Sequence, residues 1–108
     1  MLKQRTLRNS IKAVGIGLHT GKNINMELIP SEANSGIKFI RTDVDKNLVI
    51  PAIAENVGDT SLSTALVKDD VKISTIEHLL SAIAGLGVDN CLIKVDGPEV
   101  PIMDGSSS

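Results

Sequence analysis

Polar and apolar positions alternate along several short segments of the chain. In residues 23–29 the apolar side chains occupy every second position until Pro30 ends the pattern. A period of two is typical of a strand with one buried face, and proline cannot continue the hydrogen-bond ladder of a sheet. Further extended segments are predicted at residues 4–7, 11–14, 37–41, 50–57, 91–95 and 100–103.

One segment has the period of a helix instead. A helix is predicted from about residue 75 to residue 86, because its apolar side chains recur at about 100° per residue and form one stripe. Gly85 and Gly87 are expected to end it, one of them in a left-handed conformation. The stripe that should face the core consists of Ile76, Leu79, Leu80 and Ile83.

The order of these elements predicts the fold class. Residues 63–67 and 71–73 flank the turn Lys68-Asp69-Asp70 and are predicted to form a hairpin, while Gly58-Asp59 should break the chain before it. Many strands precede the helix and do not alternate with helices, which favours an α+β fold. We expect a two-layer sandwich in which a mostly antiparallel sheet of about five strands packs on one main helix.

The helix face opposite the apolar stripe has an unusual composition. A solvated helix face usually carries Lys, Glu, Arg and Gln. Here His78 is surrounded by Ser81, Ala82 and Gly85, which are small and uncharged. We therefore expect this face to be covered by a second domain, a partner or a substrate.

Glu77 and His78 allow two interpretations. Ser74 and Glu77 have the spacing of a capping box, in which both side chains bind free backbone N–H groups at a helix start. A carboxylate beside an imidazole can equally act as a general base beside a metal ligand. The bare motif favours the cap, because every helix must satisfy its first N–H groups.

Composition narrows the possible functions. The chain has 108 residues and a net charge of −2, with one aromatic residue, Phe39, so one small domain with an aliphatic core is expected. Without a basic run or aromatic platforms, nucleic-acid binding is disfavoured. Neither a signal peptide nor the roughly 18 apolar residues of a membrane helix is present, so the cytoplasm is the expected location. The single cysteine, Cys91, lies in an apolar run and is interpreted as a small buried side chain.

A second candidate motif is the glycine-rich segment GIGLHTGK at residues 15–22. Its glycines lack the four-residue separation of a phosphate-binding loop, so a turn between two strands is the simpler interpretation. His19 within it is the only imidazole besides His78.

A catalytic zinc takes three protein ligands. A complete site in this chain would need His78, His19 and a carboxylate such as Asp104 to converge. Ligands from outside the chain are an equal alternative. Serine-nucleophile chemistry has little support, because no G-x-S-x-G elbow occurs.

Several motifs taken together resemble the bacterial UDP-3-O-acyl-N-acetylglucosamine deacetylase family, which acts in lipid A synthesis. The resemblance spans the whole chain in order. It rests on the segments KQRTL (residues 3–7), GIGLHTGK (15–22), RTD (41–43), ISTIEHL (73–79), AGLGVDN (84–90) and PIMDGS (101–106).

The resemblance implies a zinc-dependent amidase that removes acetate from the 2-acetamido group of a UDP-linked, 3-O-acylated glucosamine. By the same resemblance, His78 is a zinc ligand and Glu77 the general base that takes a proton from the metal-bound water. Substrate-binding or pocket-lining positions are Leu18, His19, Thr60, Ser61, Ser63 and Asp104.

The family has two similar α+β domains with the metal between them, and this chain resembles the N-terminal one. The resemblance implies that the second domain supplies two further zinc ligands, a general acid and much of the substrate binding. Residues 1–108 alone are therefore expected to be inactive. The alternative is a non-catalytic interaction domain that docks a partner through the small-residue face of the predicted helix.

Overall fold

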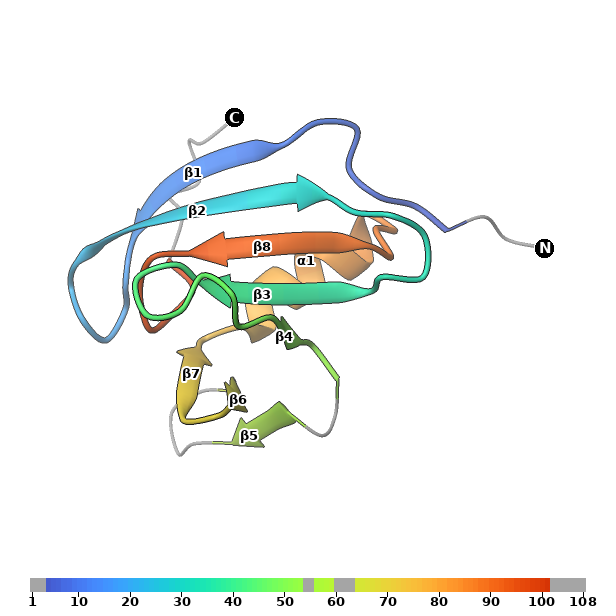
Figure 1. Ribbon diagram of the computed structural model, residues 1–108. Coiled ribbons are helices and arrows are strands. Elements are labelled where there is room, and N and C mark those ends of the chain that lie inside the picture. The colour runs from blue at the N-terminus through green and yellow to red at the C-terminus, as the bar shows by residue number, and fades with distance from the viewer. Residues whose placement is uncertain (1–3, 54–55, 60–63, 102–108) are drawn as a thin grey trace.

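The computed structural model describes residues 4–53, 56–59 and 64–101 of the chain (Figure 1). In these residues the chain forms eight strands and one helix. The elements are β1 (Ile11–Ile16), β2 (Asn23–Pro30), β3 (Ile37–Arg41), β4 (Ile50–Pro51), β5 (Val57–Asp59), β6 (Thr64–Lys68), β7 (Val71–Ser74), α1 (Glu77–Gly85) and β8 (Cys91–Val95).

The main layer is a five-stranded sheet in the order β1-β2-β8-β3-β4. Its pairs are antiparallel except β3 with β8, which run parallel. Helix α1 lies behind β8 and β3 in Figure 1 and covers that face of the sheet. The predicted α+β sandwich, with a mostly antiparallel sheet of five strands on one helix, is confirmed.

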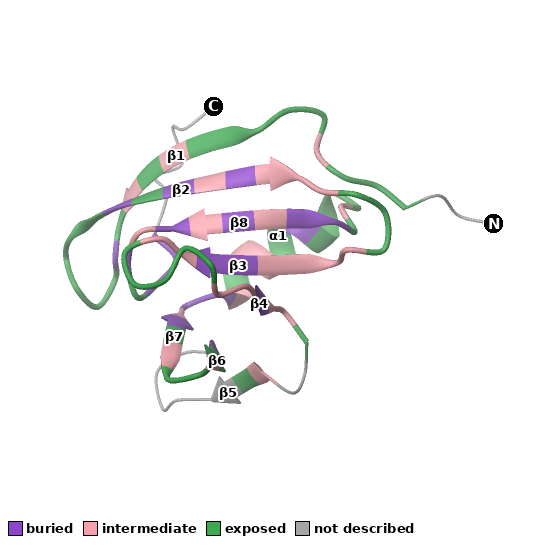
Figure 2. Ribbon diagram, in the orientation of Figure 1, coloured by how far each residue is buried: buried purple, intermediate pink, exposed green. Residues whose placement is uncertain are grey.

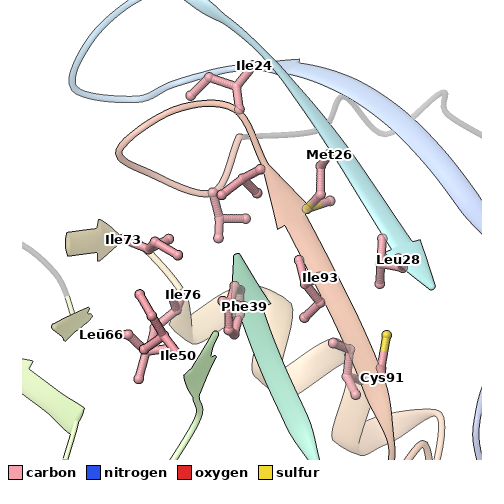
Figure 3. Close-up of a cluster of buried hydrophobic side chains, with 13 residues drawn as sticks. Ile24, Met26, Leu28, Phe39, Ile50, Leu66, Ile73, Ile76, Cys91 and Ile93 are labelled. Carbon is pink, nitrogen blue, oxygen red and sulfur yellow. The ribbon is translucent and has the colours of Figure 1, made fainter. Parts of the chain in front are cut away.

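The core lies between this sheet and α1, and alternation along the strands fills it. The strands β2 and β8 turn every second side chain inward, so buried positions alternate with half-buried ones along β8 and with exposed or half-buried ones along β2 (Figure 2). The only aromatic residue, Phe39, has no exposed surface and belongs to a cluster of aliphatic side chains (Figure 3). From α1 and its start, Ile76 and Ile83 join this cluster, and Leu79 and Leu80 pack against it, as the apolar stripe predicts.

A second, three-stranded sheet in the order β5-β6-β7 was not predicted as a separate layer. Its β6–β7 hairpin confirms the predicted one, and its turn residues Asp69 and Asp70 have φ values of 50° and 67°. Two successive positive φ values are characteristic of the tight hairpin turn whose twist matches the strands. Leu66 and Ile73 from this hairpin are fully buried in the core, which joins the second sheet to the first.

The prediction of one strand at residues 50–57, ended by Gly58-Asp59, was wrong. The structure separates β4 from β5, and Gly58-Asp59 lies within β5. Before β5, the Asn56 N–H donates to the carbonyl of Ile53 at 3.0 Å. The Asn56 side chain also donates to the carbonyl of Pro51 at 2.9 Å.

The two predicted terminal strands are reduced to isolated bridges among the described residues. Within residues 4–7 the only β-bridge to the rest of the described chain joins Thr6 to Asn90. The predicted strand at 100–103 is replaced by a bridge one residue earlier, between Glu99 and Ser74. Residues 102 and 103 lie outside the described residues.

Helix α1 is shorter than predicted at both ends. It begins at Glu77 and not at residue 75, because Thr75 has a φ of 62°, which is not helical. It ends at Gly85, one residue early. Gly87 has a φ of 73°, and the Val88 N–H donates to the carbonyl of Ile83 at 3.1 Å. This left-handed cap confirms the expected glycine stop.

Replacing Phe39 by alanine is expected to destabilise the 108-residue chain by about 3–5 kcal/mol, because the aliphatic neighbours of the ring cannot close the cavity it leaves. Urea denaturation measures the change in the free energy of unfolding. The control is Val14→Ala on β1, where the side chain is 60% exposed and the change should stay within about 0.5 kcal/mol. Equal effects of the two substitutions would contradict a core centred on Phe39.

Cys91 behaves as the sequence predicts. It is a free, fully buried cysteine at the start of β8. Burial raises the pKa of its thiol, an effect partly offset by a backbone hydrogen bond to Ile29. Because the thiolate is the reactive form, this residue is a packing residue and not a nucleophile.

No helix among the described residues has the length and hydrophobicity that crossing a membrane requires.

Candidate active site

The capping interpretation of Glu77 is wrong. Ser74 is the last residue of β7, and the N-cap position of α1 is occupied by Ile76, with no side-chain capping hydrogen bond. The Ser74 N–H, which the Glu77 carboxylate would accept in a capping box, donates instead to the carbonyl of Pro98 at 2.8 Å. The carboxylate of Glu77 therefore does not cap the helix, which is the role that the bare motif favours.

Two polar atoms at this junction are buried and without a hydrogen-bond partner among the described residues. They are Oγ1 of Thr75 and Oε2 of Glu77. Thr75 is also a β-branched residue held at positive φ, which is rare and costs backbone energy. Buried polar atoms are nearly always paired in folded proteins, so unpaired ones beside a strained residue make this junction a candidate functional position.

His78 points to the surface from the first turn of α1. It is exposed, whereas Ile76 is completely buried, so the two sides of the helix start have opposite environments. The small residues around it are exposed as predicted, and Leu86 beyond the helix end is 71% exposed. The exposed small residues are Ser81, Ala82 and Gly85.

Leu18 and His19 lie in the turn that joins β1 to β2, and both are exposed. The turn closes through a 2.9 Å hydrogen bond from the Gly17 N–H to the carbonyl of Lys22, and Gly21 has a φ of 68°. Since β2 and not a helix follows, the interpretation as a turn between two strands is confirmed and a phosphate-binding loop is excluded.

Glu99, which no sequence motif singled out, connects this turn to the segment that leads into α1. It is only 1% exposed. Its carboxylate accepts hydrogen bonds from the backbone N–H groups of His19 and Thr20, while its backbone bridges to Ser74. Its position between Pro98 and Pro101, beside apolar Val100, was the available signal, because an acidic residue in such surroundings needs a specific partner. The pocket-lining candidates Thr60, Ser61, Ser63 and Asp104 lie outside the described residues.

Three of the motif segments make contacts that hold the scaffold together. Arg41 forms a bidentate pair with Asp43, with contacts of 3.2 and 2.7 Å, and donates to the carbonyl of Lys72 in β7. Asp89 accepts a hydrogen bond from the Arg5 N–H at 2.9 Å, which fastens the N-terminal segment beside β8. These contacts join β3 to β7 and the N-terminal segment to the residues just before β8.

The described side chains fit part of a zinc site, namely one ligand and one neighbouring carboxylate. His78 is exposed and can offer an imidazole nitrogen, and Glu77 beside it has an oxygen without a partner. Among the described residues, no three side chains of His, Cys, Asp or Glu gather into a group that could hold a metal ion. If zinc binds, the described part of the chain offers one ligand and a neighbouring carboxylate, and further ligands would have to come from outside the described residues.

Comparison with known proteins gives one consistent result. The family model described as "LpxC: UDP-3-O-acyl N-acetylglycosamine deacetylase" matches residues 4–108. Over 107 residues, 99% of its length, the chain is 62% identical to the UDP-3-O-acyl-N-acetylglucosamine deacetylase of Methylococcus capsulatus. It is 58% and 59% identical over the same share to the enzymes of the same name from Hahella chejuensis and Cellvibrio japonicus. It spans about a third of these relatives, 35% of each. The chain therefore belongs to the UDP-3-O-acyl-N-acetylglucosamine deacetylase family.

Proposed function

We propose that this chain forms one side of the active site of a zinc-dependent deacetylase. Its substrate would be a UDP-linked, 3-O-acylated N-acetylglucosamine, and its product acetate. The observation that carries the proposal is the unpartnered, buried Oε2 of Glu77 next to the exposed imidazole of His78. The names of the relatives support the substrate class.

The reaction is the hydrolysis of an amide. The oxygen of a water molecule adds to the acetamido carbonyl carbon, the C–N bond breaks, and the products are acetate and the free 2-amino group. Zinc, when bound, lowers the pKa of a coordinated water toward about 7 and polarises the carbonyl. His78 would hold the zinc at one coordination position with its imidazole.

Glu77 takes the proton from the attacking water. A general base must reach that proton within about 2.6–3.2 Å, directly or through one water. Neighbouring helix residues differ by about 100° in direction, so Glu77 reaches the reacting water from the side of His78 and not from behind it. Its Oε2 accepts no hydrogen bond among the described residues, so no donor there competes with the water for that oxygen.

The exposed face of α1 supports the requirement for a covering element. Ser81, Ala82 and Gly85 present little more than backbone, so another layer can approach the helix closely. We propose that the rest of the deacetylase covers this face and contributes the missing ligands and the acid that protonates the leaving amine. Residues 1–108 alone should then bind zinc weakly and release no acetate.

The test is acetate release from UDP-3-O-acyl-N-acetylglucosamine by the complete deacetylase and by residues 1–108. The complete protein should turn over, should lose its activity to a zinc chelator and should regain it with added zinc. The 108-residue chain should show no turnover under the same conditions. Chelator-resistant activity of the complete protein, or turnover by the chain alone, would each overturn the proposal.

A further inference from the structure

A buried acidic residue outside the Glu77–His78 pair, Glu99, connects two segments of the candidate site. The Glu99 carboxylate accepts the N–H of His19 with both oxygens, at 3.0 and 3.2 Å, and the N–H of Thr20 at 2.9 Å. These donors lie about 80 residues away in the sequence, in the turn between β1 and β2. Two successive backbone N–H groups that converge on one anion form a nest, a geometry that positions a loop accurately.

The turn is shaped to admit this carboxylate. A Cβ at Gly17 would lie 2.8 Å from both Cδ and Oε2 of Glu99, and 2.5 Å from Oγ1 of Thr20. Real side chains do not make contacts this short, so only glycine lets the backbone approach the acid so closely. Among the described residues no Lys, Arg or His forms a salt bridge with Glu99, so the turn itself satisfies the carboxylate.

The backbone on both sides of Glu99 is hydrogen-bonded to Ser74, which lies shortly before the start of α1. On its two sides, the Ser74 N–H donates to the carbonyl of Pro98 at 2.8 Å, and the Val100 N–H donates to the carbonyl of Ser74 at 2.9 Å. Ser74 stands three residues before Glu77. The side chain of Glu99 therefore holds the turn with Leu18 and His19, and its backbone holds the strand that leads into Glu77 and His78.

We infer that Glu99 is a positioning residue that sets the turn of Leu18 and His19 against the catalytic helix start. The inference rests on the proposed function, because it assigns the turn a part in holding the substrate. Glu99 touches no reacting atom. It keeps the turn in the conformation that binds substrate, so its loss should weaken substrate binding more than the chemical step.

The test compares Glu99→Gln, Gly17→Ala and the control Glu32→Gln in the complete deacetylase. A glutamine keeps one acceptor oxygen and places an NH2 donor against the N–H groups of the turn. For Glu99→Gln, KM should rise by about tenfold or more, the size of effect that hydrogen bonds to a charged group carry, with kcat within about threefold. Gly17→Ala should reproduce this split, since the added methyl displaces the same carboxylate. Glu32 is exposed and its substitution should leave both constants unchanged.

A second readout separates positioning from general destabilisation. Hydrogen exchange of the His19 and Thr20 amides should quicken by about tenfold or more in both variants, while exchange in β8 stays as in the wild type. Uniformly faster exchange, or an unchanged KM in Glu99→Gln and Gly17→Ala, would overturn the inference while leaving the proposed function intact. If the wild-type protein releases no acetate, the proposed function fails. Even then, unchanged hydrogen exchange of the His19 and Thr20 amides in the variants would show that Glu99 does not fix the conformation of the turn.

Discussion

Replacing Glu77 by glutamine in the complete deacetylase is expected to lower kcat for acetate release by a factor between about 10² and 10⁴, the usual contribution of a positioned general base. Glutamine has nearly the same shape but cannot take the proton from the attacking water. Because Glu77 makes no capping bond, the free energy of unfolding should change by less than about 1 kcal/mol, the size of a charge effect at a helix N-terminus.

The measurements for this variant are initial rates, bound zinc and urea denaturation on the same preparation. Bound zinc should equal that of the wild type, because a base next to the metal is not one of its ligands. The matched control is Glu32→Gln, an exposed acidic residue outside the site, which should keep the wild-type rate. A stability loss of about 1 kcal/mol or more with an unchanged rate would restore the capping interpretation.

Replacing His78 by alanine is expected to have the second large effect, a loss of zinc together with activity. Removal of a group that only orients a ligand already costs about 10–100-fold in metal affinity, so removal of the ligand itself should cost at least about 100-fold. The fold should persist, because the side chain is exposed and packs against nothing in the core. Metal analysis after dialysis at a buffered zinc concentration measures the change.

The chain offers a natural control for this experiment. His19 is the only other histidine, and it is also exposed. His19→Ala should retain zinc, because the turn between β1 and β2 is proposed to contact substrate and not metal. Equal zinc loss in the two variants would indicate that both imidazoles are ligands, and retention in His78→Ala would exclude His78 from the zinc site.

The elements that the sequence predicts well are those whose pattern is local. Alternation in β2 and the stripe on α1 follow from the faces that these elements bury, and the structure confirms both. The hairpin around Asp69 and Asp70 is equally local, because two turn residues suffice to join its strands. The same stripe places His78 on the exposed side of the helix. The exposure of the candidate zinc ligand could therefore be predicted from the sequence.

The features that the sequence did not predict depend on contacts between distant segments. Ser74 and Glu77 have the spacing of a cap, but Pro98 and Val100 pair with Ser74 from across the fold, and the cap does not form. No local pattern indicates that Thr75 adopts a positive φ, since β-branched residues rarely do so. The role of Glu99 is likewise hidden, because its donors come from a turn near the other end of the chain.

The most direct test of the central claim is the position of zinc in a crystal structure of the complete deacetylase, located by anomalous scattering at the zinc edge. The account predicts a zinc ion at about 2.0–2.1 Å from an imidazole nitrogen of His78. It also predicts a Glu77 carboxylate oxygen within about 2.6–3.2 Å of a water next to the metal. A zinc ion bound away from His78, or a Glu77 carboxylate turned back onto the N–H groups at the start of α1, would contradict it.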